Sequence, residues 1–360
     1  MNIRRTAAYL LWPLTIWYAV GVGIRNLLYG LGLKKQESPH ITTIGIGNLC
    51  TGGSGKTPMT EYLLTLLEGT CRTAMLSRGY RRKSKGYQQD DGSHDAARLG
   101  DEAAMVAARH PGVQVAVCER RCEGIRRLMQ LPEGERPELV VMDDVYQHRH
   151  IKPNINILLT DYRHPYYTDR ILPYGNLREF RSARYRAGVV IVTKSPAVLN
   201  PVERHNIEHD LKLKNYQKVF FSYLAYGPLQ SLDGSEADPD LGQMDSALVV
   251  AGIADPAPLL EEVRRHCKAR LMAFDDHHDY TRRDIERIGE AFNALPGERK
   301  LILTTAKDAV KLQHLADGLP VYVQPVSVAF HREADADFDH YITSTVKENI
   351  SFLGKLQMWS

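Results

Sequence analysis

The stretch Ile41–Thr57, ITTIGIGNLCTGGSGKT, decides the fold. It begins with an apolar, β-branched run through Ile44 and Ile46, which is typical of a buried strand. It ends in a glycine-rich loop followed by Lys56 and Thr57. Glycines let the backbone turn sharply and bring N–H groups close to an anion. A lysine and a hydroxyl placed after the last glycine reach phosphates and Mg²⁺. The order of these parts predicts a phosphate-binding loop between a strand and a helix.

The loop has one departure from the strict form of this motif, because Cys50 stands where that form has glycine. Pro58 suits the first position of the following helix, where a missing N–H costs nothing. That helix would direct its positive end at the phosphates. An ordinary glycine-rich turn is the alternative, but such a turn has no use for Lys56 and Thr57. The residues that we expect to contact a nucleotide are Cys50, Thr51, Gly52, Gly53, Ser54, Gly55, Lys56 and Thr57.

Composition narrows the class of protein. The chain has 360 residues, which is enough for two domains that each bury a core. Its 46 basic and 43 acidic side chains give a net charge of +3, which argues against wholesale binding of nucleic acid but not against a local anion site. The five cysteines form no CxxC pair, as expected for free thiols in a reducing compartment.

The N-terminal segment is apolar and aromatic. Ala7–Ile24 carries no charge, contains Trp12 and Trp17, and is flanked by arginines and lysines. Aromatics of this kind settle at the membrane–water boundary, and flanking cations favour anionic head groups. The segment is slightly shorter than the ~20 residues of a comfortable span, and Pro13 weakens a straight helix. We therefore expect an interfacial helix; a spanning helix and a buried core helix are the alternatives.

Beyond the loop, strands and helices alternate, which indicates a parallel sheet with helices on both faces. The buried strand Leu139–Met142 runs into Asp143 and Asp144, where P-loop enzymes place an acid beside the metal. Turn or capping aspartates are the alternative. The basic run Arg78–Lys85 begins where a parallel strand should end, on the side where open α/β sheets bind ligands. A solvated charged loop would look the same.

Two polar features allow more than one interpretation. Asp101 directly precedes a predicted helix, so it could cap that helix or act as a base near the phosphates. The residues alone favour the cap. The cluster Phe274–Tyr280, rich in Asp and His, could bind a metal, but its spacing is not that of a zinc motif.

Together these pieces resemble the tetraacyldisaccharide 4′-kinase family, the lipid A 4′-kinases of Gram-negative bacteria. Val145-Tyr146, Phe180 and Ala306 depart from the family pattern, which has Gly-Phe, Pro and Glu there. These departures concern substrate fit more than reaction type. The motifs that carry the resemblance are Gly47–Pro58, Ser77–Tyr80, Gly100–Glu102, Asp143–His148, Leu172–Glu179, Asp276–Tyr280 and Thr305–Val310.

The resemblance implies an activity and a location. The chain would phosphorylate the 4′-hydroxyl of a tetraacyl glucosamine disaccharide 1-phosphate with ATP and Mg²⁺. It would work at the cytosolic face of the bacterial inner membrane, anchored by its N-terminal helix, with no obligate protein partner evident. The implied fold is a P-loop kinase unit and a smaller α/β unit joined by a two-stranded linker. The parts expected are residues 1–35 (membrane-associating helix), 36–218 (P-loop kinase core), 219–330 (smaller α/β domain with linker strands) and 331–360 (a tail returning to the core).

The resemblance also implies roles for single residues. Lys56 would draw charge off the transferred phosphate, and Asp101, oriented by His277, would accept the sugar proton. Arg78, Arg81 and Arg178 would meet the phosphate of the substrate. The residues expected around the metal are Thr57, Asp143, Asp144, Gln147 and Glu179.

Two other functions fit parts of the sequence. An ATP-switched membrane partition or assembly module also carries Gly-Gly-x-Gly-Lys-Thr, but its signature lysine stands where this chain has Thr51. A P-loop ligase or small-molecule kinase without a lipid substrate would have no use for the tryptophan-rich N-terminus.

Overall fold

The computed structural model describes residues 3–232, 239–253, 255–276, 278–313, 315, 318–331 and 337–358, with side chains described between Trp12 and Lys355. The chain divides into two compact units. The first unit consists of Met1–Leu224 and Val328–Ser360, and the second of Ala225–Ser327.

A nine-stranded sheet forms the centre of the first unit. Its strands are parallel from β4 to β8, and β3 is antiparallel to β4. In spatial order the strands are β14 (Val326–Phe330), β8 (Lys218–Tyr226), β7 (Val189–Thr193), β6 (Ile155–Asp161), β1 (Thr42–Asn48), β5 (Leu139–Met142), β2 (Thr73–Ser77), β4 (Gln114–Val117) and β3 (Gln88–Gln89).

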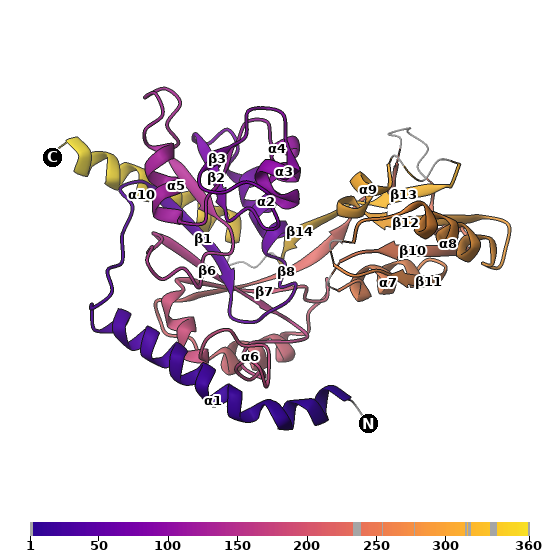
Figure 1. Cartoon of the computed structure of the whole chain (residues 1–360), viewed down its shortest axis with the longest axis horizontal. Coiled ribbons are helices and arrows are strands. Elements are labelled where there is room, and N and C mark those ends of the chain that lie inside the picture. Colours follow the sequence, from indigo (N-terminus) through magenta and orange to yellow (C-terminus); the bar gives the residue numbers. More distant parts are fainter. Residues whose placement is uncertain are drawn as a thin grey trace. The chain divides into compact units, whose positions relative to one another are not determined.

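Helices cover both faces of this sheet (Figure 1). Alternate residues of the strands pack on one face against α2, α4 and α10, and on the other against α5, α6 and η1. Because both faces are covered, β1 is buried at every position, and buried and exposed residues do not alternate along it. The helices are α1 (Ile3–Gly30), α2 (Lys56–Leu67), α3 (Ala96–Leu99), α4 (Asp101–Arg109), α5 (Arg121–Leu128), the 3₁₀ helix η1 (Arg181–Arg186), α6 (Pro201–Leu211) and α10 (Phe338–Met358).

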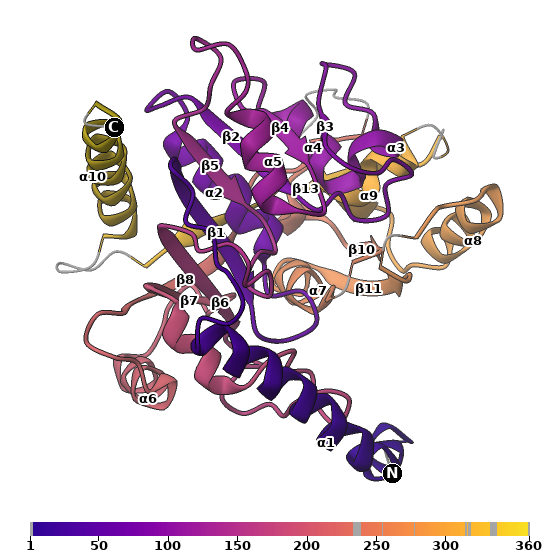
Figure 2. The same cartoon turned by 60° about the vertical axis from the view of Figure 1, so that its left-hand side comes forward.

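The N-terminal helix lies along the outside of the first unit (Figures 1 and 2). Its outward side chains include Trp12 and Trp17, which are 57% and 76% exposed, so the alternative of a buried core helix is wrong. Among the helices within the described ranges, none is long and apolar enough to cross a bilayer. At the other end of the chain, α10 packs Phe338 and Ile342 into the same core as β1.

The second unit has its own five-stranded sheet, parallel except for β9. Its order is β11 (Lys268–Ala273), β10 (Ser246–Ala251), β12 (Lys300–Thr305), β13 (Val321–Gln324) and β9 (Gln230–Ser231). The helices are α7 (Ala257–Arg264), α8 (Arg282–Asn293), α9 (Ala306–Leu312) and the 3₁₀ helix η2 (Leu241–Gln243).

The α/β class with a parallel sheet and a second, smaller α/β unit is confirmed. The strands β8 and β14 are neighbours at one edge of the large sheet, and each continues across the boundary between the units. Residues 321–328 form parts of two strands, β13 and β14, which are separated at Pro325. Proline has no N–H for a ladder hydrogen bond, so the pairing ends there.

Candidate active site

The candidate site forms where three neighbouring parallel strands end. In the sheet β5 lies between β1 and β2, and Met142 at its end is in register with Gly45 and Leu76. The glycine-rich loop follows β1, Asp143 and Asp144 follow β5, and Arg78 follows β2. Segments far apart in the sequence therefore meet at the carboxyl edge of one sheet, the edge where open α/β folds bind ligands.

Helix α2 begins at this edge of the sheet, directly after the glycine-rich loop, and its first turn has no side-chain cap. Gly55 is the N-cap of α2 and adopts φ 81°, a left-handed conformation that glycine takes without strain. It contributes no side-chain hydrogen bond to the first turn, which leaves the positive end of α2 available to an anion. The Thr193 hydroxyl donates to the Ser54 carbonyl at 3.0 Å and fixes the loop from β7. The Ser54 hydroxyl is buried and finds no hydrogen-bond partner among the described residues.

Lys56 and Thr57 open the helix and point at acidic partners. Lys56 Nζ lies 3.7 Å from Asp144 Oδ1 and 3.5 Å from Asn48 Oδ1. The Thr57 hydroxyl donates to Glu102 Oε2 at 3.3 Å. The ammonium and the hydroxyl thus stand beside the helix end that would receive phosphates.

The two aspartates after β5 have opposite electrostatic environments. Asp143 is buried, and its Oδ1 accepts from the Thr60 hydroxyl and the Asp144 amide. Burial, reinforced by the negative charges of Glu102 and Asp144, raises the pKa of Asp143 to about 6. Burial also opposes ionisation of Asp144, but Lys56 and then Arg178 outweigh it and lower the pKa of this carboxyl.

Arg178 and Gln147 complete this group. Arg178 Nη1 lies 3.3 Å from Asp144 Oδ1 and donates to Gln147 Oε1 at 3.2 Å. The Gln147 amide donates to the Asn48 carbonyl at 2.7 Å, which ties it to the end of β1. The structure therefore brings together Lys56, Asp144, Gln147 and Arg178, with Asp143 directly before Asp144 in the chain.

These residues fit a magnesium ion of the kind that P-loop enzymes use. Mg²⁺ keeps several waters and is bound through one or two carboxylates and substrate phosphates rather than by an all-protein cage. Consistent with this, the described residues contain no preassembled group of three His, Cys, Asp or Glu ligands. Burial and the nearby carboxylates of Glu102 and Asp144 disfavour the ionised form of Asp143. A divalent cation bound beside it would offset this cost.

Glu179 is not brought to this group, contrary to the expectation for a metal ligand. Its carboxylate is fully buried and forms ion pairs with Arg25 Nη2 of α1, at 3.2 Å, and with Arg186 Nη2, at 3.0 Å. Two arginines pair with this carboxylate, and no sequence pattern places either of them beside it, so a role of Glu179 at the metal stays a prediction.

The capping interpretation of Asp101 is wrong. Gly100 is the N-cap of α4, with φ 87° and no side-chain cap, and Asp101 is the first helical residue. A Cβ at Gly100 would lie 2.6 Å from the Tyr80 carbonyl, so glycine is required where the chain passes the end of β2. The neighbouring Glu102 contacts Thr57, which places the start of α4 beside the nucleotide loop.

The two other predicted substrate cations lie at the carboxyl end of β2. Arg78 and Arg81 are exposed, and the Arg81 guanidinium stands over the Tyr80 ring at 5.6 Å from its centroid. His277 lies outside the described residues, so its pairing with Asp101 stays a prediction.

Sequence reasoning missed Arg121. This side chain is fully buried and donates to the Cys118 carbonyl at 2.7 Å and the Asp143 carbonyl at 3.1 Å, so it fixes the turn that carries the aspartates. Burial lowers the pKa of Arg121 to about 10. No pattern separates Arg121 from the adjacent Arg120. Glu102 was also missed, although its position directly after Asp101 could have drawn attention to it.

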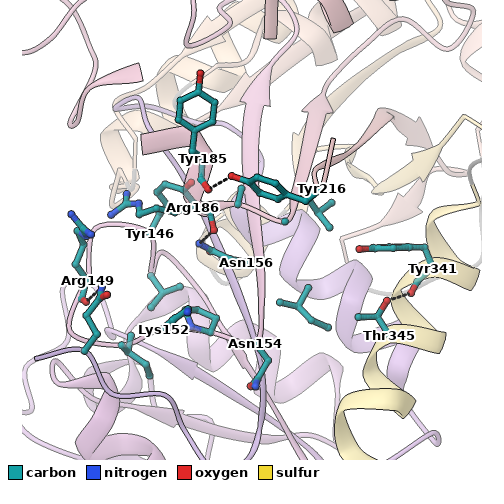
Figure 3. Close-up of a pocket in the computed structure, with 18 residues that line it drawn as sticks. Tyr146, Arg149, Lys152, Asn154, Asn156, Tyr185, Arg186, Tyr216, Tyr341 and Thr345 are labelled. Carbon is teal, nitrogen blue, oxygen red and sulfur yellow. Dashed lines mark hydrogen bonds between the residues drawn. The ribbon is translucent and has the colours of Figure 1, made fainter. Parts of the chain in front are cut away.

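The residues drawn in Figure 3 line a cavity of about 440 Å³. Residues at the starts of β6 and β7, Ile155, Asn156 and Val189, line it together with Arg149 and Arg186. It therefore belongs to the amino edge of the parallel strands, opposite the edge that carries Lys56.

Comparisons with known proteins identify the family of this chain. The family model described as tetraacyldisaccharide-1-P 4′-kinase matches residues 7–347. A tetraacyldisaccharide 4′-kinase of Bacteroides thetaiotaomicron is 39% identical over 355 residues, covering 94% of this chain and 93% of that protein. One of Parabacteroides distasonis is 38% identical and covers 95% of each chain. Among solved structures, LpxK of Aquifex aeolicus, crystallised with ATP, is similar with a TM-score of 0.71 and 28% identity over 96% of this chain and 99% of that one.

Proposed function

This chain belongs to the tetraacyldisaccharide 4′-kinase family, and we infer from that premise that it transfers the γ-phosphoryl group of ATP to the 4′-hydroxyl of a tetraacyl glucosamine disaccharide 1-phosphate, a step of lipid A biosynthesis. The observation that carries this function is the glycine-rich loop and uncapped helix end, with Lys56 beside Asp144. The family match sets aside the partition module and the small-molecule kinase.

We propose that the nucleotide loop works mainly by positioning and by charge neutralisation, since phosphoryl transfer leaves little covalent work to the protein. The amides of residues 50–57 hold the phosphates at the start of α2. Lys56 exchanges its contact with Asp144 for the β- and γ-phosphate oxygens. Thr57, Asp143 and Asp144 would hold Mg²⁺, directly or through water, and Gln147 supports them from the end of β1. When bound, the ion supplies neutralisation of the developing phosphate charge.

Asp101 is the proposed general base. It stands in the first turn of α4, next to the residue that contacts Thr57. A sugar hydroxyl is too weak an acid to ionise beforehand, so a base is useful only as the new P–O bond forms. The position of Asp101 relative to that hydroxyl therefore decides whether it can act as the base. The proposal that His277 orients Asp101 rests on the family resemblance alone.

Arg78 and Arg81 are proposed to bind a phosphate of the lipid substrate. Both are exposed at the edge of the sheet that carries the nucleotide loop. Guanidinium groups match phosphate bidentately, which orients an acceptor as well as attracting it. Arg178 instead contacts Asp144 and Gln147, so we assign it to the ATP side of the site.

We propose that α1 docks on the cytosolic surface of the inner membrane. Its outward side chains are apolar along one face: Trp12, Ile16, Val20, Ile24 and Leu27 recur at helical spacing and are each between 46% and 59% exposed. The opposite face carries the polar contacts to the kinase unit. A multiply acylated sugar stays in the bilayer, so an enzyme that binds the bilayer through an apolar helix face meets its substrate there.

A liposome flotation experiment tests this docking. Trp17→Glu combined with Ile24→Glu places two charges on the outward surface of α1 and should weaken vesicle binding by about tenfold or more. Val198→Glu is the control, because Val198 is also exposed and apolar but lies outside α1. Equal vesicle binding by both variants would contradict the docking proposal.

A direct assay tests the reaction. Labelled ATP and the acylated disaccharide acceptor should give a labelled glycolipid, resolved by thin-layer chromatography. Asp101→Ala should abolish that product while a nucleotide analogue still binds. Substantial remaining product would reject Asp101 as the base. ATP turnover that does not depend on the acceptor would contradict the kinase function.

A further inference from the structure

One short segment of the first unit is bonded to the nucleotide loop on one side and to α1 on the other. We call Tyr174–Phe180 the bridging segment. On the loop side, the Thr51 amide donates to the Asn176 carbonyl at 2.8 Å, and the Arg178 amide donates to the Leu49 carbonyl at 2.7 Å. Cys50 and Leu177 form an isolated antiparallel bridge between these two bonds. The bridging segment thus fixes the backbone of the loop immediately before its glycines.

On the other side, one face of α1 holds the same segment. The Thr15 hydroxyl accepts from the Tyr174 amide at 3.2 Å. The Tyr18 hydroxyl donates to the Arg178 carbonyl at 3.0 Å. Arg25 pairs with the buried Glu179 at 3.2 Å. Spacings of three and seven residues place these side chains on one side of a helix, away from its apolar outward face.

Arg178 is where the two sides meet. Its amide is bonded to the nucleotide loop, its carbonyl to α1, and its guanidinium to Asp144 and Gln147. A shift of the Arg178 backbone would therefore displace both the loop and the partner of Asp144. Misplacement of about 1 Å at groups that position reacting atoms can cost on the order of 100-fold in rate.

We propose that α1 is part of the apparatus for phosphoryl transfer as well as its membrane anchor, with Tyr18 and Arg25 as positioning residues that hold the bridging segment against the nucleotide loop. One rigid helix then connects the membrane-facing surface to the ATP side of the site. The inference rests on the proposed nucleotide site. It requires that contacts made by α1 affect turnover even where no bilayer is present.

The test uses the full-length protein with detergent-dispersed substrate, which removes any need for vesicle docking. Tyr18→Phe deletes only the hydroxyl that reaches Arg178 and should lower kcat by about threefold to tenfold, the effect of one lost hydrogen bond. Its KM for the lipid and its binding to vesicles should not change. Tyr29→Phe is the control, because Tyr29 is on the same helix but its ring contacts Arg149, 4.8 Å from the guanidinium, and Lys34 rather than Arg178.

A double-mutant cycle gives a readout that a general loss of packing would not move. If Tyr18 acts partly through the Arg178 guanidinium, then Tyr18→Phe should have a smaller effect in an Arg178→Ala background, where the contact with Asp144 is already lost and only the backbone bond to Leu49 remains. Arg25→Met should lower kcat more than Arg25→Lys, which keeps a cation beside Glu179. Melting temperatures of all variants identify any that fail to fold, and Tyr18→Phe keeps the test decisive if Arg25→Met is one of them.

The outcomes separate this inference from the proposed site. Unchanged kcat for Tyr18→Phe, an equal loss for Tyr29→Phe, or additive effects with Arg178→Ala would each overturn the positioning role of α1 and leave the nucleotide site standing. Full activity of both single variants, Arg178→Ala and Lys56→Ala, would instead overturn the nucleotide site itself.

Discussion

Replacing Asp143 with asparagine should stabilise the protein while removing its activity. Asp143 is buried, and burial followed by Glu102 and Asp144 raises the pKa of its carboxyl from 3.8 to about 6. At about 1.36 kcal/mol per pKa unit, a rise of this size lowers the free energy of unfolding by about 3 kcal/mol at a pH well above 6. Asparagine keeps the shape and the acceptor for the Thr60 hydroxyl but carries no charge. Asp143→Asn should therefore raise the Tm by about 5 to 10 °C at pH 7.5.

The sign of the pH dependence follows from the direction of the shift. Below pH 3.8 the carboxyl of Asp143 is protonated in both the folded and the unfolded chain, so it has no effect on the free energy of unfolding. Between pH 3.8 and about 6 the unfolded chain ionises first, and the cost to the folded state grows; above pH 6 the cost is complete. The advantage of Asp143→Asn should therefore fall to about half as the pH is lowered from 7.5 to 5.

Asp144 supplies a matched control of opposite sign. Lys56 and Arg178 outweigh burial and lower the pKa of this carboxyl, so its charge stabilises the folded state. Asp144→Asn should lower the Tm at pH 7.5, where Asp143→Asn raises it. Thermal unfolding would be followed without Mg²⁺ or nucleotide at both pH values. A lower Tm for Asp143→Asn at pH 7.5, or a gain that grows on acidification, would refute the electrostatic reasoning about the pair.

Three further substitutions have defined outcomes. Gly100→Ala places a Cβ 2.6 Å from the Tyr80 carbonyl at a φ of 87° and should cost about 1 to 3 kcal/mol of stability, measured by urea unfolding, whereas Gly134→Ala has open space and should change stability little. Thr57→Val should raise the Mg²⁺ concentration needed for half-maximal turnover, and Thr57→Ser should restore it; no change with valine would remove Thr57 from the metal site. Glu179→Gln should lower the Tm, because it leaves two arginines beside a neutral amide, without altering the Mg²⁺ requirement. A changed Mg²⁺ requirement would return Glu179 to the metal.

Local patterns account for the part of the site that was foreseen. The strand and loop of Ile41–Thr57 carry their own glycines, lysine and hydroxyl, so neighbouring residues in sequence specify the phosphate cradle. Asp143 and Asp144 could be placed because a buried parallel strand has only one end at which ligands bind. Gln147 follows them closely in the chain, and its place beside them was implied by the family resemblance rather than by a local pattern.

Tertiary contacts account for what was missed. The partners of Glu179 come from α1 and from η1, and no spacing in the sequence brings Arg25 to that carboxylate. Arg121 lies beside Arg120 in one basic run, and only the packing of α5 decides that Arg121 is the buried one. The sequence around Asp101 is typical of a helix cap. In the structure Gly100 is the N-cap instead, because the chain there passes too close to the end of β2 for a side chain.

Main-chain amides and Lys56 are proposed to hold ATP for transfer to the lipid sugar, and the rate of glycolipid formation by a Lys56 variant tests this role. Purified Lys56→Ala should lose labelled glycolipid product by about 100-fold or more, since it removes the cation beside Asp144 that neutralises the transferred phosphate. Lys152→Ala, an exposed lysine at the opposite edge of the sheet, should retain the parent rate. A folded Lys56→Ala protein that makes the product at the parent rate would show that Lys56 does not take part in phosphoryl transfer.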